Sequence, residues 1–231
     1  MGQKTSSLGI TVQQPDKADI VCEIFSQAVV YASQKLKEYL GFDDPSGTFH
    51  PSTETLNEIF LVNFIGYCIE KGVEERIVTN KTSQQQSLLF GTDWIWTLYG
   101  SDKLVKLQIA VQTLQMSELN VNTENMKEES EAPGGTHKDK SRFKKLEEFC
   151  NQVGPDCLGL FIIYGLPGKP KDIRGVLLDS VKDTNTSPGE CALGEFILNT
   201  DTFLPTRDML DTCLSKKNGQ RNIGKVYINF L

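Results

Sequence analysis

The sequence predicts an α+β fold, in which a mostly antiparallel β-sheet is covered by helices within a single domain that carries a disordered insertion. Two periodicities lead to this prediction: apolar residues recur every three to four positions early in the chain and alternate at every second position later on. Helices gathered early in the sequence and strands gathered late are typical of α+β proteins. We expect a flexible arm at residues 1–15 and one domain at 16–231.

The first predicted helix runs from Asp16, which can cap its start, to Gly41, which can end it. Its apolar stripe recurs every four residues and consists of Ile20, Ile24, Ala28, Ala32, Leu36 and Leu40. Such a stripe faces either the core or a partner, and the core is the more common role. A second helix, apolar on almost every side and therefore central, is expected from Ser52 or Thr53 to Gly72. A short polar helix is expected across residues 82–90.

Residues 94–99 and 104–114 alternate in polarity around a turn at 100–102, which predicts a β-hairpin with one face in water. The polar segment 117–141 contains no aromatic residue and is expected to be a disordered insertion. The remaining expected elements are helices at 142–153 and 205–214 and strands at 157–164, 175–181, 192–199 and 225–231.

The composition excludes some classes of function. The 231 residues include 24 basic and 30 acidic side chains, so the formal net charge is −6. Because binding to nucleic acid depends on clustered Lys and Arg, we expect none for this acidic chain. Two histidines and six cysteines without a C-x-x-C pair indicate neither a zinc site nor a disulfide framework. We therefore expect buried thiols, no metal and no cofactor.

No established catalytic motif stands out in the sequence, and no catalytic residue is assigned. The segment Gly165–Lys169 follows an apolar strand, as a phosphate-binding loop does. However, Ile163 stands where that loop needs its first glycine, and Pro170 stands where it needs a hydroxyl residue. A turn between two strands is therefore expected. The alternative to a non-enzymatic protein is a cytosolic enzyme that uses Cys157 or this turn.

Two features indicate contact with a membrane surface. Gly2 and Ser6 fit the pattern for N-myristoylation, although Gly2 also fits as no more than a small second residue. One myristoyl chain binds a bilayer only weakly, so a second signal is needed. A basic stretch either solvates the start of a helix or supplies that signal by touching anionic lipid. It consists of Lys138, Lys140, Arg142, Lys144 and Lys145.

Several runs of residues resemble the Rab15 effector family of vertebrates, a small and isolated group. They are the N-terminal MGQK, QKLKEYLGF at 34–42, LNEIFL at 56–61, DWIWT at 93–97, AVQTLQM at 110–116, KLEEFCN at 145–151 and GKPKDIRGV at 168–176. The resemblance spans nearly the whole chain and is weakest at 117–141 and 183–195.

The resemblance implies a non-enzymatic effector that binds the GTP-loaded form of a Rab GTPase, namely the recycling Rab of the family name and Rab-three relatives. It implies a place on the cytoplasmic face of early and recycling endosomes, in the return of transferrin receptor to the cell surface. The family supplies no residue-level binding motif. A third possibility is a structural adaptor whose insertion is the functional part.

The expected Rab contacts are therefore chosen on chemistry, because apolar and aromatic side chains dominate such interfaces. One group lies on the outward side of the first helix, and the other lies on the 94–99 edge, where the two tryptophans either anchor the core or form an interface hot spot. The candidates are Tyr31, Lys35 and Tyr39 in the first group and Trp94, Trp96 and Tyr99 in the second.

Overall fold

A computed structural model describes residues 17–119, 141–182, 190–215 and 223–231. Its helices are α1 (Lys17–Leu36), α2 (Thr53–Glu70), α3 (Gln84–Phe90), a short 3-10 helix (Met116–Glu118), α4 (Arg142–Val153), α5 (Leu178–Lys182), α6 (Glu190–Asn199) and α7 (Thr206–Ser215). Its strands are β1 (Ile77–Lys81), β2 (Trp94–Tyr99), β3 (Val105–Gln115), β4 (Cys157–Leu166), β5 (Lys169–Leu177), β6 (Phe203–Pro205) and β7 (Tyr227–Asn229).

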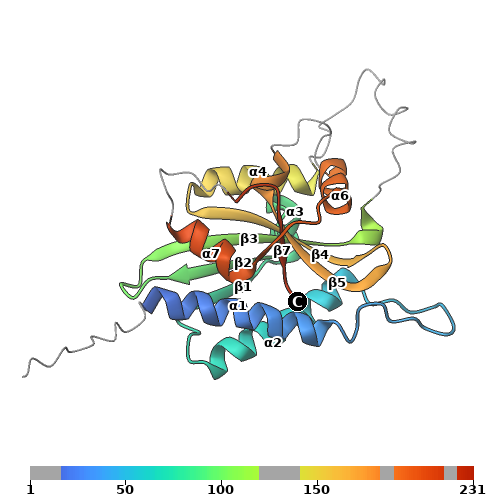
Figure 1. Cartoon of the computed structure of the whole chain (residues 1–231), viewed down its shortest axis with the longest axis horizontal. Helices are drawn as coiled ribbons and strands as arrows, with labels where there is room; N and C mark the ends of the chain where they lie inside the picture. The colour runs from blue at the N-terminus through green and yellow to red at the C-terminus, as the bar shows by residue number, and fades with distance from the viewer. Residues whose placement is uncertain (1–16, 120–140, 183–189, 216–222) are drawn as a thin grey trace, which may run out of the picture.

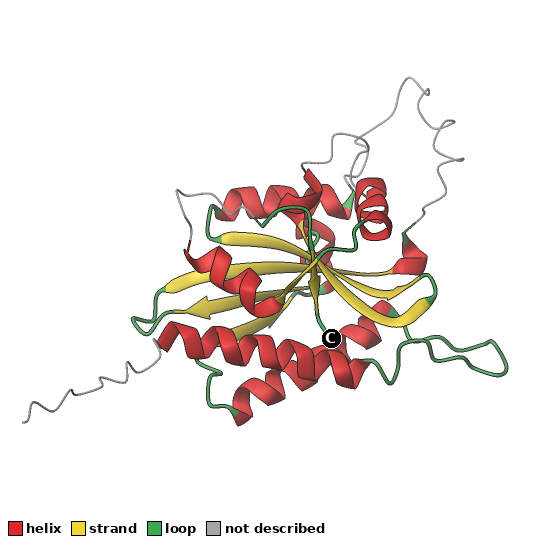
Figure 2. Cartoon of the chain, in the orientation of Figure 1, coloured by secondary structure: helices red, strands yellow, loops and turns green. Residues whose placement is uncertain are grey.

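The strands form one seven-stranded sheet in the order β1-β2-β3-β4-β5-β7-β6. The helices lie on both sides of it, as Figure 2 shows. The α+β class is thus confirmed, but the sheet is mixed rather than mostly antiparallel, because β3 pairs with β4 and β6 pairs with β7 in parallel. A parallel pair needs a long crossover, and between β3 and β4 the crossover carries α4.

Two hydrophobic clusters lie on the two faces of the sheet. Helices α1, α2 and α7 pack on one face, over an aromatic group made of Phe25, Phe60, Phe64, Trp94 and Trp96. Helices α4, α5 and α6 pack on the other face. In Figure 1, α1 and α2 lie below the strands, and α4 and α6 lie above them. Because both faces are covered, the expectation of a hairpin with one wet face is wrong, and Gln112 of β3 is only 1% exposed.

Local signals account for the helix boundaries that the sequence predicted well. The Ser52 side chain accepts a hydrogen bond from the Thr55 amide at the start of α2, and Ser141 caps α4 in the same way through Lys144. A capping box of Ser83 and Gln86 begins α3, which ends at Gly91 with φ of 70°. Helix α1, by contrast, ends at Leu36, and residues 37–41 form turns instead of continuing it to Gly41.

Other expected elements are corrected. The run expected as a strand at 192–199 is helix α6, and the strand expected at 175–181 is β5, which starts at Lys169 and gives way to α5 at Leu178. Strands β1 and β6 were not expected. Most of the expected insertion (120–140) lies outside the described residues, but at its beginning Ser117 and Glu118 belong to the 3-10 helix and Leu119 is buried. Within the described residues, no helix is long and apolar enough to cross a membrane.

Candidate interaction surface

A pair of tyrosines marks the outer side of the layer formed by α1 and α2. The rings of Tyr31 and Tyr67 lie with centroids 5.2 Å apart, and the Tyr67 hydroxyl donates a hydrogen bond of 3.0 Å to Gln27. The ammonium groups of Lys35 and Lys71 lie 5.7 and 5.1 Å from the centroids of Tyr31 and Tyr67, respectively. Cations at this distance are attracted by the ring face, so the four side chains hold one another in place while staying at the surface.

A second exposed group lies on the opposite flank of α2. Val62, Ile65 and Ile69 are 71%, 38% and 57% exposed, and their spacing of three and four residues places them on one side of the helix. That side continues toward β1, because Glu58 lies four residues before Val62 and accepts a 2.7 Å hydrogen bond from Lys81 of β1. We call Glu54, Glu58, Val62, Ile65 and Ile69 the α2 flank.

The α2 flank is unusual for the exterior of a folded chain. Single exposed apolar residues are common, but three large aliphatic side chains in one row indicate an interaction surface. The same helix packs against the core through Phe60 and Phe64, so its exposed row is not needed for folding. This row was not predicted from the sequence, because α2 is apolar on almost every side and periodicity cannot tell which apolar residues stay outside.

Two of the expected contact residues are in the core. Trp94 and Trp96 are 0% exposed and pack against Phe60 and Phe64 under α1 and α2. The expectation that they offer their rings to a partner is therefore corrected: β2 is not an edge strand, since β1 pairs with it on its outer side. Their alternation did predict correctly that the two indoles share a face.

The other expected contacts stay at or near the surface but do not form one site. Tyr31 and Lys35 are exposed on α1 near Tyr67, whereas Tyr39 is 47% exposed in the turn after α1. Tyr99 is half-buried at the end of β2, where its carbonyl accepts a 2.8 Å hydrogen bond from Arg76. Together with Lys103 and neighbouring residues, Tyr99 lines a cavity of about 510 Å³.

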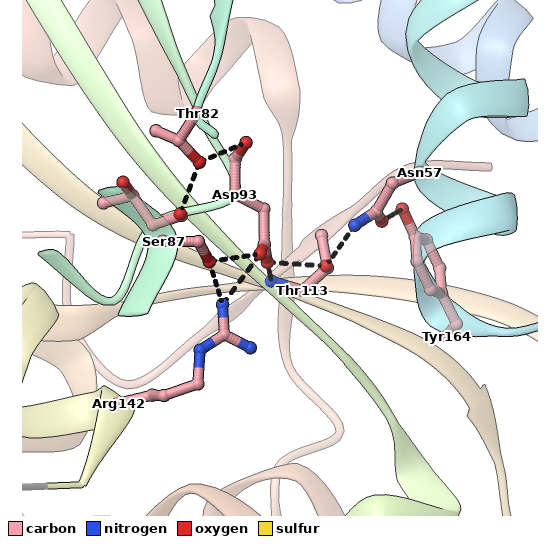
Figure 3. Close-up of polar contacts among 8 residues, drawn as sticks. Asn57, Thr82, Ser87, Asp93, Thr113, Arg142 and Tyr164 are labelled. Carbon is pink, nitrogen blue, oxygen red and sulfur yellow. Dashed lines mark hydrogen bonds and ion pairs between the residues drawn. The ribbon is translucent and has the colours of Figure 1, made fainter. Parts of the chain in front are cut away.

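A polar network joins the helices on both faces of the sheet, and Asp93, just before β2, is at its centre (Figure 3). One carboxylate oxygen of Asp93 accepts from Arg142 Nη2 at 2.7 Å and from the Ser87 hydroxyl at 3.2 Å. The other accepts from the amide and the hydroxyl of Thr113 at 2.7 and 2.8 Å. Asp93 thereby holds α3, α4 and β3 together.

The network continues to the α2 side of the sheet. The Thr113 hydroxyl accepts a 2.7 Å hydrogen bond from Asn57 of α2, whose side-chain oxygen accepts a 2.9 Å bond from the Tyr164 hydroxyl. Burial, and to a lesser extent the charge of Asp93, raises the pKa of Tyr164 above its ordinary value, so this hydroxyl stays protonated and donates. Because the side chains of Asn57, Thr113 and Tyr164 are hydrogen-bonded to one another in series, the network fixes how α2 lies on the sheet.

A pocket of about 370 Å³ opens beside the network, between α2, α3 and the end of β1. Its lining is mixed. Leu61 and Leu88 give it an apolar wall, and Glu54, Lys81 and Asp93 give it charged groups of both signs. It is therefore suited to one side chain of a partner better than to a phosphate, since the Arg142 and Lys81 charges are already paired with carboxylates.

Of the expected membrane-proximal basic group, the structure describes Arg142, Lys144 and Lys145. Gly2, Lys138 and Lys140 lie outside the described residues. Lys144 is exposed on α4, and Lys145 is half-buried. The guanidinium of Arg142 is bound to Asp93 and Ser87, which gives this residue a structural role. The expected contact of the five basic residues with lipid stays a prediction.

Cys157 and the segment Gly165–Lys169, which the alternative enzyme would use, both have structural roles. The segment Gly165–Lys169 is the tight turn between antiparallel strands β4 and β5, whereas a phosphate loop leads into a helix. Cys157 is 6% exposed at the start of β4. Cys22, Cys68, Cys150, Cys157 and Cys213 are buried, as the sequence predicts, and burial raises the pKa of Cys68 to about 12. Among the described residues, no cluster of His, Cys, Asp or Glu could hold a metal ion.

Comparison with known proteins gives a consistent result. A family model described as "Rab15 effector" matches residues 7–230. A mouse protein named "Rab15 effector protein" is 44% identical over 236 residues, and the alignment covers 100% of both chains.

Proposed function

The chain belongs to the Rab15 effector family, and from this premise we propose that it is a non-catalytic effector that binds Rab15 in its GTP-loaded state. Rab-three relatives are proposed as further partners. The observation that carries the proposal is the match along the whole chain, since the folded region and not one short motif is shared with a protein of that name. The structure supports it by presenting exposed aromatic and aliphatic side chains that folding does not use.

We propose that the GTPase contacts the outer side of α1 and α2. Tyr31 and Tyr67 resemble the hot-spot residues of protein interfaces, because a tyrosine offers a large apolar ring together with a hydroxyl group. Lys35 and Lys71 lie beside these rings and carry charges at the rim. The α2 flank adds Val62, Ile65 and Ile69, which gives the interface an apolar centre.

Selection of the GTP-loaded state follows from the behaviour of the GTPase. The γ-phosphate orders the two switch segments of a GTPase, and hydrolysis releases them. A rigid effector surface binds ordered switch segments at a lower cost in conformational entropy, so its affinity differs between the two states. The polar network around Asp93 supports such rigidity, because it fixes α2 against the sheet.

The membrane part of the proposal rests on the N-terminus. We propose myristoylation of Gly2 and contact of Lys138, Lys140, Lys144 and Lys145 with anionic lipid on the cytoplasmic face of recycling endosomes. The membrane-anchored GTPase and the lipid then act as two linked attachments. We propose that this activity serves the recycling of transferrin receptor. Intact-mass measurement of the protein from eukaryotic cells tests the acylation, and an unmodified Gly2 contradicts it.

Calorimetric titration with Rab15 tests the central proposal. We expect saturable binding to Rab15 loaded with a non-hydrolysable GTP analogue and at least tenfold weaker binding to the GDP-loaded form, a difference of about 1.4 kcal/mol. Equal affinity for the two forms contradicts the effector assignment. The same titration with Rab-three proteins tests the wider partner range.

A further inference from the structure

Strand β1 is an edge of the seven-stranded sheet, and its hydrogen-bonding direction follows from its register. The Tyr99 amide donates to the Arg76 carbonyl, and the Thr82 amide donates to the Asp93 carbonyl. Residues of an antiparallel strand point their backbone groups alternately to either side. Even-numbered residues of β1 therefore pair with β2, and the backbone groups of Thr79 and Lys81 point away from the sheet.

These outward groups have no backbone partner in the part of the chain that the structure describes. The hydrogen bonds outside the regular ladders include none to the amide or carbonyl of Thr79 or Lys81. Among the described strands, β2 is the only sheet neighbour of β1. The edge thus offers two N–H and two C=O groups in the spacing that another extended backbone matches.

The α2 flank runs beside this edge. Glu54 and Glu58 on that flank lie 3.6 and 2.7 Å from Lys81 Nζ, and Val62 and Ile65 continue the row. A protein that covers the exposed aliphatic side chains of α2 therefore also reaches the backbone of β1. The pocket of about 370 Å³ lies at the end of the same strand and is lined by Lys81 and Thr82.

We propose that the β1 edge accepts an extended segment of the GTP-loaded GTPase as an additional strand, and this inference rests on the proposed function. The surroundings of the edge favour a segment that carries basic residues. Acidic side chains outnumber basic ones there, with Glu54, Glu58, Glu74 and Glu75 against Arg76, Lys81 and Lys103. A second copy of this chain brings the same excess of negative charge and is the less suitable occupant.

Strand addition also explains how the effector distinguishes the nucleotide states. Backbone pairing requires a partner segment that is already extended, and ordering a flexible segment costs conformational free energy for each residue. The γ-phosphate supplies that order in the GTPase. The β1 edge therefore pairs only with a switch segment whose backbone is already extended, while Val62 and Ile65 contact the side chains of that segment.

Proline at position 79 tests the inference with little disturbance to the fold. Thr79→Pro removes an N–H that points outward and does not pair with β2, and edge strands tolerate proline at such positions. Thr79→Val is the matched control, because it keeps the N–H and the β-branched shape. We expect Thr79→Pro to weaken binding to GTP-loaded Rab15 about tenfold relative to Thr79→Val. Thermal unfolding of both variants, with the same Tm, confirms that the fold is kept.

Amide hydrogen exchange in the complex of the unmodified protein gives an independent measurement. We expect slower exchange at Thr79 and Lys81 when GTP-loaded Rab15 is bound, and little change at Val78 and Asn80, which already pair with β2.

If the unmodified protein binds but both Thr79 variants bind equally well and exchange does not change, strand addition is wrong while the effector function stands. If the unmodified protein does not bind GTP-loaded Rab15, both proposals fail. Slow amide exchange at Thr79 and Lys81 in the protein alone, together with a dimeric mass, would mean that a second copy of this chain occupies the edge. That result overturns the inference.

Discussion

Arg142 Nη2 lies 2.7 Å from Asp93 Oδ1, and this ion pair joins the first residue of α4 to the residue that precedes β2. Both side chains are partly screened from water, with 34% and 18% exposed. The Ser87 hydroxyl of α3 contacts both partners. The pair therefore fixes the beginning of α4, which directly follows the segment that the structure leaves undescribed.

Removal of the arginine should destabilise the fold. Arg142→Ala leaves the Asp93 carboxylate with fewer donors, which costs about 1 to 3 kcal/mol for a partly buried charged group. Lys144→Ala is the control, since Lys144 is exposed on the same helix turn, and a change within about 0.5 kcal/mol is expected. Urea denaturation measures both free energies of unfolding, and equal values for the two variants contradict the structural role of Arg142.

The side chains of Asn57 and Tyr164 should be energetically coupled, because they share one hydrogen bond. Asn57→Ala removes partners from both Thr113 and Tyr164, so we expect a loss of about 2 to 3 kcal/mol, and Tyr164→Phe a loss of about 1 kcal/mol. In the double variant the two losses should not add, because Tyr164→Phe deletes a bond that Asn57→Ala has already broken. Strict additivity in denaturant unfolding means that the two residues are not coupled.

A charge on the α2 flank should impair binding without affecting folding. Val62→Asp places a carboxylate in the row of exposed aliphatic side chains, and we expect affinity for GTP-loaded Rab15 to fall at least tenfold. Leu198→Asp is the matched control, because Leu198 is 44% exposed on α6, in the opposite helical layer. Titration calorimetry and thermal unfolding of both variants separate binding from stability. An equal loss of affinity in the two variants contradicts an interface on the α2 flank.

Cys68 should make stability depend on pH in alkaline solution. Burial, and then the charge of Glu74, raises the pKa of this thiol from 9.0 to about 12. The unfolded chain therefore releases this proton at lower pH than the folded one, so the contribution of Cys68 is complete below pH 9 and is lost as the pH rises toward 12. The difference in unfolding free energy between the unmodified protein and Cys68→Ala, measured from pH 8 to 11, should shrink as the pH rises. A constant difference indicates an ordinary thiol pKa.

Local sequence patterns predicted some elements to the residue. Helix α4 begins and ends where its capping serine and its apolar spacing place it, at Arg142 and Val153. The apolar run at 192–199 fits a buried strand or a buried helix equally well, so its periodicity does not distinguish the two. In the structure it is helix α6, which packs in the same layer as α4. Parallel pairing of β3 with β4 has no local signal, because it is set by the path of the crossover.

The candidate site was less predictable than the fold. Alternation showed that Trp94 and Trp96 share a face but not that α1 and α2 cover that face. The partner of Arg142 is 49 residues away, so the basic stretch around it gave no sign of a partly buried ion pair. The β1 edge depends on a strand of five residues that was not expected at all. The exposed Tyr31 of α1 was found in the sequence, but its pairing with Tyr67 required the structure.

One measurement tests the account most directly: the affinity of the full-length protein for Rab15 in its two nucleotide states. Side-by-side titrations with Rab15 carrying a non-hydrolysable GTP analogue and with Rab15 carrying GDP should show at least tenfold tighter binding to the former. Equal affinities, or no binding to either form, contradict the account.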